Sequence, residues 1–352
     1  MTPDDRKEKV FYNALNLSLE SNHRQLKKLK EKNGSWEKSW EEYARSNKTS
    51  IDPKKEFEKL ESKNIYLFLF EDEDFPDLLK EIPWPPHGIY ILGQKEIPNK
   101  NLLAVVGTRK ATLAGKEITR SFAKKIAGVG FTIVSGLALG IDTEGHKGAL
   151  EAGKSTLAVI ATGLDSIYPK INTELAKKII MSHGAIISEY PLGSPALPHR
   201  FLERNRLVSG LSNGVLIIEA PERSGSLATA RFALDQNREV FVVPGPITHP
   251  NFKGSNQLIR EGAALITSPE EIIEVLAPEL LTANDSERIE KLTLDATNEE
   301  KLILEALLKT GKPVNIDKIA ELTNLNAKII NQTVSFLIIK NLIKETENGY
   351  TI

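Results

Sequence analysis

The segment His199–Arg206 holds the densest set of anion-binding side chains in the sequence. It runs His-Arg-Phe-Leu-Glu-Arg-Asn-Arg, so four of its eight residues can be cationic, with one aromatic ring and one Asn between them. Guanidinium groups bind phosphates and an aromatic ring stacks on a base, which suits single-stranded nucleic acid. The alternative is a solvated helix on which Glu203 pairs with the arginines while Phe201 belongs to the core.

A second candidate is the loop Gly107-Thr108-Arg109-Lys110, which follows the apolar run 102–106 and precedes a helical pattern. Backbone N–H groups at such a turn suit a phosphate, and Arg109 and Lys110 add two cations. The next glycine is Gly115, and no acid ends the following strand, so the loop is not a dinucleotide fingerprint. It also lacks the Gly-Lys-Ser/Thr ending of an ATP-binding loop. A glycine needed only for a tight turn is the alternative.

A third candidate is Ser224-Gly225-Ser226, which follows the run 215–219 and begins another helical pattern. A serine cap and free N–H groups at the start of a helix form an anion-binding loop with hydroxyls beside it. Ser226 as a nucleophile would need a base, and the sequence places no His or Lys near it.

Asp142 and His146 stand four residues apart on a predicted helix and therefore on one face. The pair fits a metal site or an acid–base couple. A capping Asp and a hydrogen-bonded His are favoured instead, because no third ligand lies nearby in the sequence.

Apolar runs of strand length alternate with amphipathic helical patterns between residues 97 and 277. The runs are Leu102–Val106, Phe131–Val134, Thr156–Ala161, Ala185–Ser188, Val215–Glu219, Val240–Val243 and Ala264–Thr267. Strands buried on both faces that alternate with helices indicate an α/β fold with a doubly wound parallel sheet. Ligands bind such sheets at the carboxyl ends of the strands, where the glycine-containing loops lie.

Composition separates the remaining regions. Residues 1–82 are rich in Lys and Glu with helical spacing, and Trp36, Trp40 and Tyr43 share one helix face, which predicts a small helical (SAM-like) domain with an aromatic core. Residues 83–280 form the α/β domain and 281–297 a polar linker. Residues 298–352 predict three short helices and a hairpin at Asn348-Gly349, the pattern of a winged-helix domain.

The charge of residues 298–352 does not favour a DNA-reading role. They hold seven Lys and seven Asp/Glu, and the would-be recognition helix carries only Lys328 and Lys340. A protein-contact or regulatory role is therefore favoured over DNA contact.

The overall composition is that of an ordinary globular protein, with 40% apolar and 26% charged residues. The absence of Cys excludes disulfides, thiolate metal sites and Cys nucleophiles. No run approaches the ~20 apolar residues that span a bilayer, and the acidic start lacks the pattern of a signal peptide, so we expect a cytoplasmic protein without membrane contact. The net charge is −1, but residues 97–277 carry 20 Lys/Arg and 16 Asp/Glu, so basic charge is concentrated there.

Ordered motifs run through the chain from about residue 74 to 276. They are Gly107-Thr108-Arg109, Ser135-Gly136-Leu137-Ala138, Gly140-Ile141-Asp142 with His146, Gly163-Leu164-Asp165, Tyr168-Pro169, Ser188-Glu189-Tyr190-Pro191, Arg204-Asn205-Arg206, Ser224-Gly225-Ser226-Leu227, Thr229-Ala230 and Pro244-Gly245. This order resembles the DNA-processing protein A family (DprA, also called Smf). Three departures are Thr108 where Ser is commoner, Leu202 where Pro is usual, and the absence of Gly from 19–23.

The resemblance implies an extended Rossmann fold that binds and protects single-stranded DNA, forms a homodimer and loads the RecA recombinase during natural transformation. It implies neither a catalytic activity nor a cofactor. The strand contacts that it implies are Gly107, Thr108, Arg109, Phe201, Arg204, Asn205, Ser224, Gly225 and Ser226. The charge pattern adds Lys110, Arg200 and Arg206.

The competing hypothesis is a Rossmann-fold nucleotide-binding or nucleotide-hydrolysing enzyme, because the fold resembles the lysine-decarboxylase-like nucleotide hydrolases. The resemblance implies that such enzymes need a Gly-Gly-x-Gly-Thr loop followed by a catalytic Glu. The equivalent loop here, Ser224–Arg231, contains no carboxylate, so the acid–base group is missing. A transcription factor acting through the C-terminal domain is disfavoured by that domain's neutral charge.

Overall fold

The chain forms two compact units, Met1–Leu276 and Ala277–Ile352. The computed structural model describes residues 3–280, 296–310, 312–340, 342–346 and 348–351. Nearly all of the predicted linker 281–297 lies outside the described residues. Within the described part, no helix has the length and apolar character needed to cross a bilayer.

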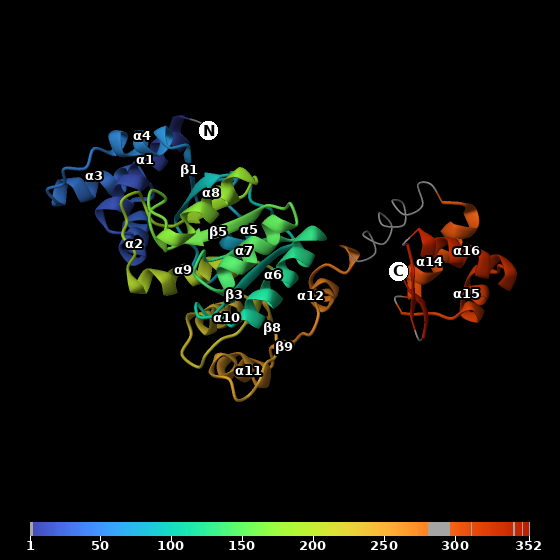
Figure 1. The fold of residues 1–352 in the computed structure, drawn as a ribbon. Coiled ribbons are helices and arrows are strands. Elements are labelled where there is room, and N and C mark those ends of the chain that lie inside the picture. The colour runs from blue at the N-terminus through green and yellow to red at the C-terminus, as the bar shows by residue number, and fades with distance from the viewer. Residues whose placement is uncertain (1–2, 281–295, 311, 341, 347, 352) are drawn as a thin grey trace. The chain divides into compact units, whose positions relative to one another are not determined.

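A nine-stranded sheet organises the first unit, in the order β1-β2-β6-β5-β4-β3-β7-β8-β9 (Figure 1). Its strands are β1 (Ile65–Leu69), β2 (Gly88–Gly93), β3 (Leu102–Gly107), β4 (Thr132–Ser135), β5 (Thr156–Ile160), β6 (Ala185–Ser188), β7 (Gly214–Ile218), β8 (Glu239–Val242) and β9 (Ala264–Leu265). The strands from β6 to β9 pair in parallel, whereas β1–β2 and β2–β6 pair antiparallel. All seven predicted strands occur at the expected places.

Helices cover both faces of this sheet, which confirms the doubly wound α/β fold. One face carries α5 (Asp77–Lys80), α9 (Pro198–Gly210), α10 (Gly225–Asp235) and α11 (Lys253–Arg260). The other carries α6 (Leu113–Gly128), α7 (Ile141–Glu151), α8 (Thr173–Met181) and α12 (Pro269–Leu276). Within β3, Leu102, Ala104 and Val106 join the first core. Val105 lies against α7 instead, because alternate side chains of a strand point to opposite faces.

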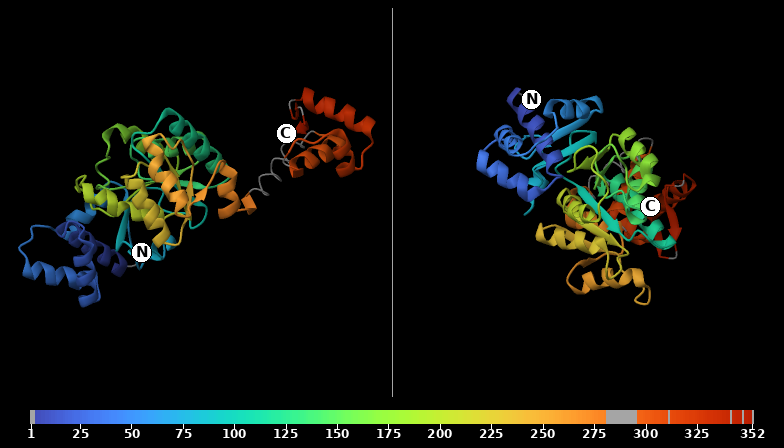
Figure 2. Two further views of the ribbon diagram at one scale, coloured as in Figure 1. Left: turned by 90° about the horizontal axis from the view of Figure 1, so that it is seen from below. Right: turned by 90° about the vertical axis from the view of Figure 1, so that its left-hand side faces the viewer.

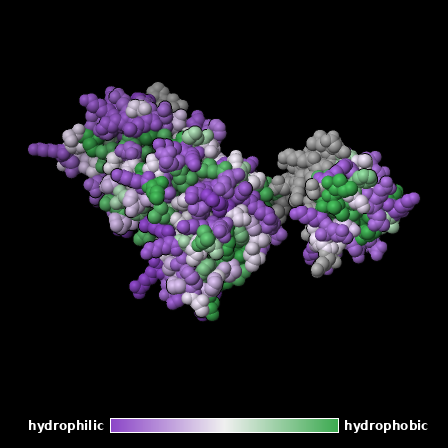
Figure 3. All heavy atoms as spheres, viewed as in Figure 1, coloured by the Kyte–Doolittle hydropathy of each residue, from purple (hydrophilic) through white to green (hydrophobic). Residues whose placement is uncertain are grey.

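The N-terminal region contains α1 (Pro3–Ser18), α2 (His23–Asn33), α3 (Trp36–Ser46) and α4 (Pro53–Ser62). The aromatic face predicted for α3 is confirmed, because Trp36 and Trp40 are buried and Tyr43 packs beside them. The surface over these helices is mostly hydrophilic, as the abundance of Lys and Glu requires (Figure 3). The helices lie together beside one end of the sheet in each view (Figures 1 and 2).

The expected boundary at residues 82/83 does not separate two compact units, and the sheet is not purely parallel. Residues 65–69, assigned from sequence to the helical domain, form β1, which pairs with β2 in register from Ile65–Leu92 to Leu69–Gly88. Tyr90 of β2 is buried beneath α1, and its hydroxyl donates to Asn13 Oδ1 at 2.9 Å. The N-terminal helices and the sheet therefore share one core.

The second unit contains α14 (Asn298–Thr310), α15 (Ile316–Thr323), α16 (Ala327–Ile339), β10 (Lys344–Thr346) and β11 (Gly349–Thr351). The three predicted helices pack around their own apolar core, which includes Ile303, Ile330 and Leu337. The hairpin at Asn348-Gly349 is confirmed by the antiparallel pairing of β10 with β11. The assignment of this unit to the winged-helix fold stays a prediction.

Candidate functional site

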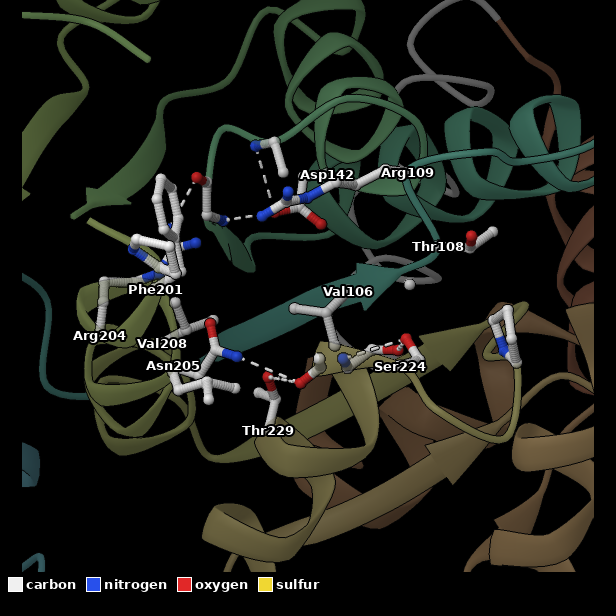
Figure 4. A pocket seen from close by; sticks show the side chains of 18 of the residues that line it. Val106, Thr108, Arg109, Asp142, Phe201, Arg204, Asn205, Val208, Ser224 and Thr229 are labelled. Carbon is white, nitrogen blue, oxygen red and sulfur yellow. Dashed lines mark hydrogen bonds between the residues drawn. The ribbon is translucent and has the colours of Figure 1, made fainter. Parts of the chain in front are cut away.

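The strand order reverses direction at β3. From β3 the chain winds outward through β4, β5 and β6 on one side, and through β7, β8 and β9 on the other. Ligands of open α/β sheets bind at the carboxyl ends of the strands at such a switch point. A pocket of about 570 Å³ lies here, lined by the loops after β3 and β7 and by one face of α9 (Figure 4). That volume falls within the usual range of ligand sites.

The loop after β3 supplies Gly107, Thr108 and Arg109 to this pocket. Gly107 is required for packing, because a Cβ there would clash with the Ile218 carbonyl oxygen and with Ile141. The N–H of Thr108 donates to Glu219 O at 2.8 Å, and that of Lys110 to Thr108 Oγ1 at 3.2 Å. These two N–H groups are therefore engaged, contrary to the expected phosphate cradle.

The charged side chain of Arg109, rather than the backbone, is what this loop offers an anion. Arg109 is exposed and lines the pocket, whereas Lys110 is also exposed but does not line it. The following helix, α6, begins only at Leu113, after its N-cap Thr112, so its dipole is displaced from the pocket.

Six residues of helix α9 line the pocket, and four of them follow helical spacing: Phe201, Arg204, Asn205 and Val208 (Figure 4). Residues at i, i+3, i+4 and i+7 share one face of a helix. Phe201 is partly exposed, and the centroid of its ring lies 5.4 Å from that of Tyr168. Asn205 Nδ2 donates to Gly225 O at 3.1 Å and so joins α9 to the start of α10.

Arg204 is buried at the base of the pocket. Its Nη1 donates to the carbonyl oxygens of Gly136 and Val159, and its Nε has no hydrogen-bond partner among the described residues. Burial lowers the pKa of this guanidinium to about 10, although Asp142 opposes the shift. Arg204 therefore holds the strand-to-helix turn at Gly136. Its charge also makes the electrostatic potential at the base of the pocket more positive.

Asp142 is the anionic side chain of the pocket, and it serves the same turn. Its Oδ2 accepts from the N–H groups of Gly136 at 3.0 Å and Ala138 at 3.3 Å. Burial raises its pKa, while Arg204 and the two N–H groups oppose that shift. His146 Nδ1 lies 2.8 Å from Thr156 Oγ1. The hydrogen-bonded role of His146 is thus confirmed. Asp142 does not cap α7, whose N-cap is Gly140 without a side-chain bond, and it holds the loop after β4 instead. Among the described residues no cluster of three metal-binding side chains exists.

Two of the predicted strand contacts point away from the pocket and require correction. Arg206 is 1% exposed, and its Nη2 donates to both carboxylate oxygens of Glu189, at 2.7 and 2.8 Å. The guanidinium of Arg200 is also buried, donating to Pro195 O and Glu20 O at 3.2 Å. Arg200 is one residue before Phe201 and Arg206 five after it, so both lie on other faces of α9 and anchor the helix to its neighbours.

The loop after β7 forms the opposite wall with Ser224, Gly225 and Ser226. Ser224 caps α10, and its Oγ accepts from Ser226 N at 3.2 Å and lies 2.6 Å from Ser226 Oγ. The predicted helix cap is confirmed. The Ser226 hydroxyl has a serine beside it rather than a base.

Among the aromatic and cationic side chains of this pocket, sequence reasoning missed two. Tyr168 is 47% exposed and stands beside Phe201, and Arg223 is exposed immediately before the Ser224 cap. Each had a signal in the sequence: Tyr168 belongs to the Tyr-Pro motif noted above, and Arg223 adjoins a predicted anion loop.

Comparison with known proteins identifies the family. A family model described as "DNA recombination-mediator protein A" matches residues 66–277, more than half of the chain. The chain belongs to this family. The matched residues include all of the pocket.

Named members of the DNA recombination-mediator protein A family match at moderate identity. Protein Smf of Escherichia coli is 44% identical over 217 residues, which cover 62% of this chain and 58% of that protein. The DNA processing protein DprA of Streptococcus pneumoniae is 40% identical over 221 residues, covering 62% of this chain and 75% of that protein. The chain thus spans less than two thirds of the length of the Smf relative.

Two solved structures of the family also match. The X-ray structure of DprA from Streptococcus pneumoniae superposes with a TM-score of 0.60 at 34% identity, covering 68% of this chain and 80% of that one. A structure of DprA from Helicobacter pylori, described as revealing a single-stranded DNA binding mode, has a TM-score of 0.55 at 31% identity. That match covers 61% of this chain and 96% of the other.

Proposed function

We propose that this protein binds single-stranded DNA in the pocket at the carboxyl ends of β3 and β7 and serves DNA recombination. The observation that carries the proposal is the pairing of an exposed cation with partly exposed aromatic rings in one pocket. The guanidinium carbon of Arg109 lies 5.4 Å from the centroid of Phe201, and Tyr168 flanks the same ring. Cations for phosphates beside rings for bases are what sequence-tolerant binding of a single strand needs.

The side chains of the pocket fall into groups with different expected tasks. Arg109 and Arg223 are exposed and can neutralise phosphates, while Phe201 and Tyr168 can stack on bases. Ser224 and the start of α10 supply polar groups on the opposite wall. Arg204 acts from below as a positioning residue, because its Nη1 is already bonded to two carbonyl oxygens.

We infer that the pocket holds its ligand without transforming it. The Asp142 carboxylate accepts two backbone N–H groups and lies near the guanidinium groups of Arg109 and Arg204, so it is committed to the fold. The alternative, a nucleotide-hydrolysing enzyme, needs a carboxylate in the segment Ser224–Arg231, which has none. Incubation with nucleoside monophosphates separates the two, since release of base or phosphate would favour the enzyme.

The wider role rests on the family resemblance. It suggests that the bound strand is protected and delivered to the RecA recombinase during natural transformation, and that the protein acts as a homodimer. Recombinase-catalysed strand exchange, measured with and without the full chain, tests the delivery, and light scattering tests the oligomeric state.

The direct test of the proposed function is a titration of the full chain with labelled oligo-dT and with duplex of equal length, at two salt concentrations. We expect tighter binding to oligo-dT, because ring stacking needs unpaired bases. We also expect affinity to fall as salt rises, because phosphate contacts release counterions. Equal affinity for duplex and single strand would contradict the stacking role, and no binding at either salt would overturn the assignment.

A further inference from the structure

A second hollow, here called the α7 groove, adjoins the pocket on the other face of the sheet. It has a volume of about 770 Å³ and lies along α7, with α6 on one side and α8 on the other. Lys116 and Arg120 reach it from α6, Lys147 from α7 and Lys178 from α8. The function proposed above makes no use of these side chains.

The pocket and the α7 groove meet at Arg109, which lines both. The backbone between them is closely packed at Gly140, whose φ of 78° is in the left-handed region. A Cβ at that position would clash with the Thr108 carbonyl oxygen and press on the backbone of Arg109. The glycine therefore lets the start of α7 pack directly against the loop that carries Arg109, where the pocket and the α7 groove meet.

The ion pairs of the α7 groove leave it with unpaired positive charge. Its carboxylates are held internally: Glu144 by Lys147 at 2.9 Å, Glu151 by Arg120 at 3.3 Å, and Glu174 by Lys177 at 2.7 Å. Within the described part of the chain, Lys116, Lys178 and Arg109 form no ion pair. The cations that remain available therefore line the α7 groove from both sides, Lys116 from α6 and Lys178 from α8, and Arg109 also lines the pocket.

Two exposed apolar side chains add a surface to the α7 groove that suits the sugars and bases of a nucleic-acid strand. Leu139 and Ile171 line the α7 groove and are 42% and 78% exposed. Apolar surface beside unpaired lysines fits sugars and bases that follow a phosphate backbone. A free phosphate would use only the lysines.

We propose that the α7 groove binds the next stretch of a single strand whose first nucleotides occupy the pocket, with Lys116 and Lys178 neutralising its phosphates. This proposal rests on the proposed function of the pocket and extends it. Two consequences follow: the binding site is longer than the pocket, and the strand turns around the Arg109 loop from one face of the sheet to the other.

The first experiment uses oligo-dT of about four and about sixteen nucleotides, the range of site sizes known for single-strand modules. The double variant Lys116→Ala/Lys178→Ala is compared with Lys124→Ala/Lys154→Ala. The control removes the same charge from exposed lysines that do not line the α7 groove. We expect the first variant to weaken binding of the longer oligonucleotide by about two- to thirtyfold. Its salt slope should fall by about 1.4, since each phosphate contributes ~0.7 on a single strand.

The comparison of lengths separates the two proposals. Unchanged affinity of the first variant for the short oligonucleotide, with loss for the long one, supports the α7 groove. Equal behaviour of the two double variants at both lengths overturns the α7 groove but leaves the pocket intact. Failure of the unmodified chain to bind either length overturns the proposed function itself.

A second experiment locates the strand directly. The chain contains no Cys, so Lys178→Cys introduces a single thiol. Oligo-dT of about sixteen nucleotides with a disulfide-forming group at one end or the other should cross-link to that thiol from one end only. Lys154→Cys is the control and should not cross-link. Equal cross-linking of the two variants, or of neither, would contradict the proposed path.

Discussion

The guanidinium carbon of Arg109 lies 5.4 Å from the centroid of the Phe201 ring, joining the loop after β3 to helix α9 across the pocket. A cation over the face of an aromatic ring is attracted by the ring quadrupole. In the unbound protein the guanidinium and the ring therefore stabilise each other's position. In the proposed function, a bound strand should replace this contact, with a base on the ring face and a phosphate at the guanidinium.

Arg109→Ala should weaken the binding of all oligonucleotide sequences alike, because a phosphate contact carries no base information. The expected cost is about 1–3 kcal/mol for a charge-assisted bond. The salt slope should decrease by ~0.7, measured by titration at several salt concentrations. Lys124→Ala, an exposed cation outside the pocket, is the control. Unchanged slope and affinity in Arg109→Ala would show that Arg109 does not contact the strand.

Phe201→Ala should weaken binding by roughly 1–3 kcal/mol per stacked base with a nearly constant salt slope, because no phosphate contact is lost. The partly exposed ring should contribute little to stability. Phe241→Ala is the matched control: that ring is fully buried, and its removal should cost about 3–5 kcal/mol of folding free energy. Melting temperature and affinity are measured together. A large loss of stability in Phe201→Ala would assign the ring to the core instead.

The contact between Arg109 and Phe201 predicts that their substitutions are not additive. In a double-mutant cycle for oligo-dT binding, the coupling should be about 0.5–3 kcal/mol, as for other residues in contact. Arg109 with Phe241, which lies in the core, is the reference cycle. Strict additivity of Arg109 and Phe201 would show that the strand uses the two groups independently.

Arg206→Ala should destabilise the fold without removing a strand contact. It leaves the Glu189 carboxylate, 11% exposed, without its buried partner, which typically costs about 3–5 kcal/mol. The control Arg6→Ala breaks a pair that is 46% exposed on both sides, worth about 0–1 kcal/mol. Urea unfolding gives the difference. Normal stability with weaker, less salt-dependent DNA binding would return Arg206 to the strand-binding set.

Buried histidines predict loss of stability in mild acid. Burial lowers the pKa of His146 to about 3, with Arg204 adding to the shift, and lowers that of His87 to about 4. In the unfolded chain both titrate near 6.5. Between those values the unfolded state binds more protons, so stability is full above pH ~6.5 and falls as the pH decreases towards 4.

The size of this acid effect can be tested on one histidine at a time. At pH 5, each buried histidine should cost about 2 kcal/mol relative to pH 7.5, measured by urea unfolding. His146→Gln should reduce the dependence on pH, while the exposed His199→Gln should leave it unchanged. An identical pH dependence in His146→Gln would show that His146 is already accessible to protons.

Local patterns of the sequence determined the α/β architecture and two walls of the site. Apolar runs such as Leu102–Val106 are strands buried on both faces, and Ser224 caps a helix because its side chain bonds within three residues. Features of this kind depend on periodicity and near neighbours, so a sequence suffices to predict them.

Tertiary structure alone decided which cations face the pocket. The sequence gives Arg200, Arg204 and Arg206 the same charge, but α9 rotates by about 100° per residue, and only the face with Phe201 and Asn205 meets the pocket. The positions of the other two arginines depend on residues distant in the chain. Arg206 donates to the Glu189 carboxylate, and Arg200 donates to Glu20 O. The edge strand β1 likewise exists because it pairs with β2, and Tyr168 joins the site because its loop packs beside α9. Such long-range pairing is fixed by the packed fold, since no short stretch of sequence contains both partners.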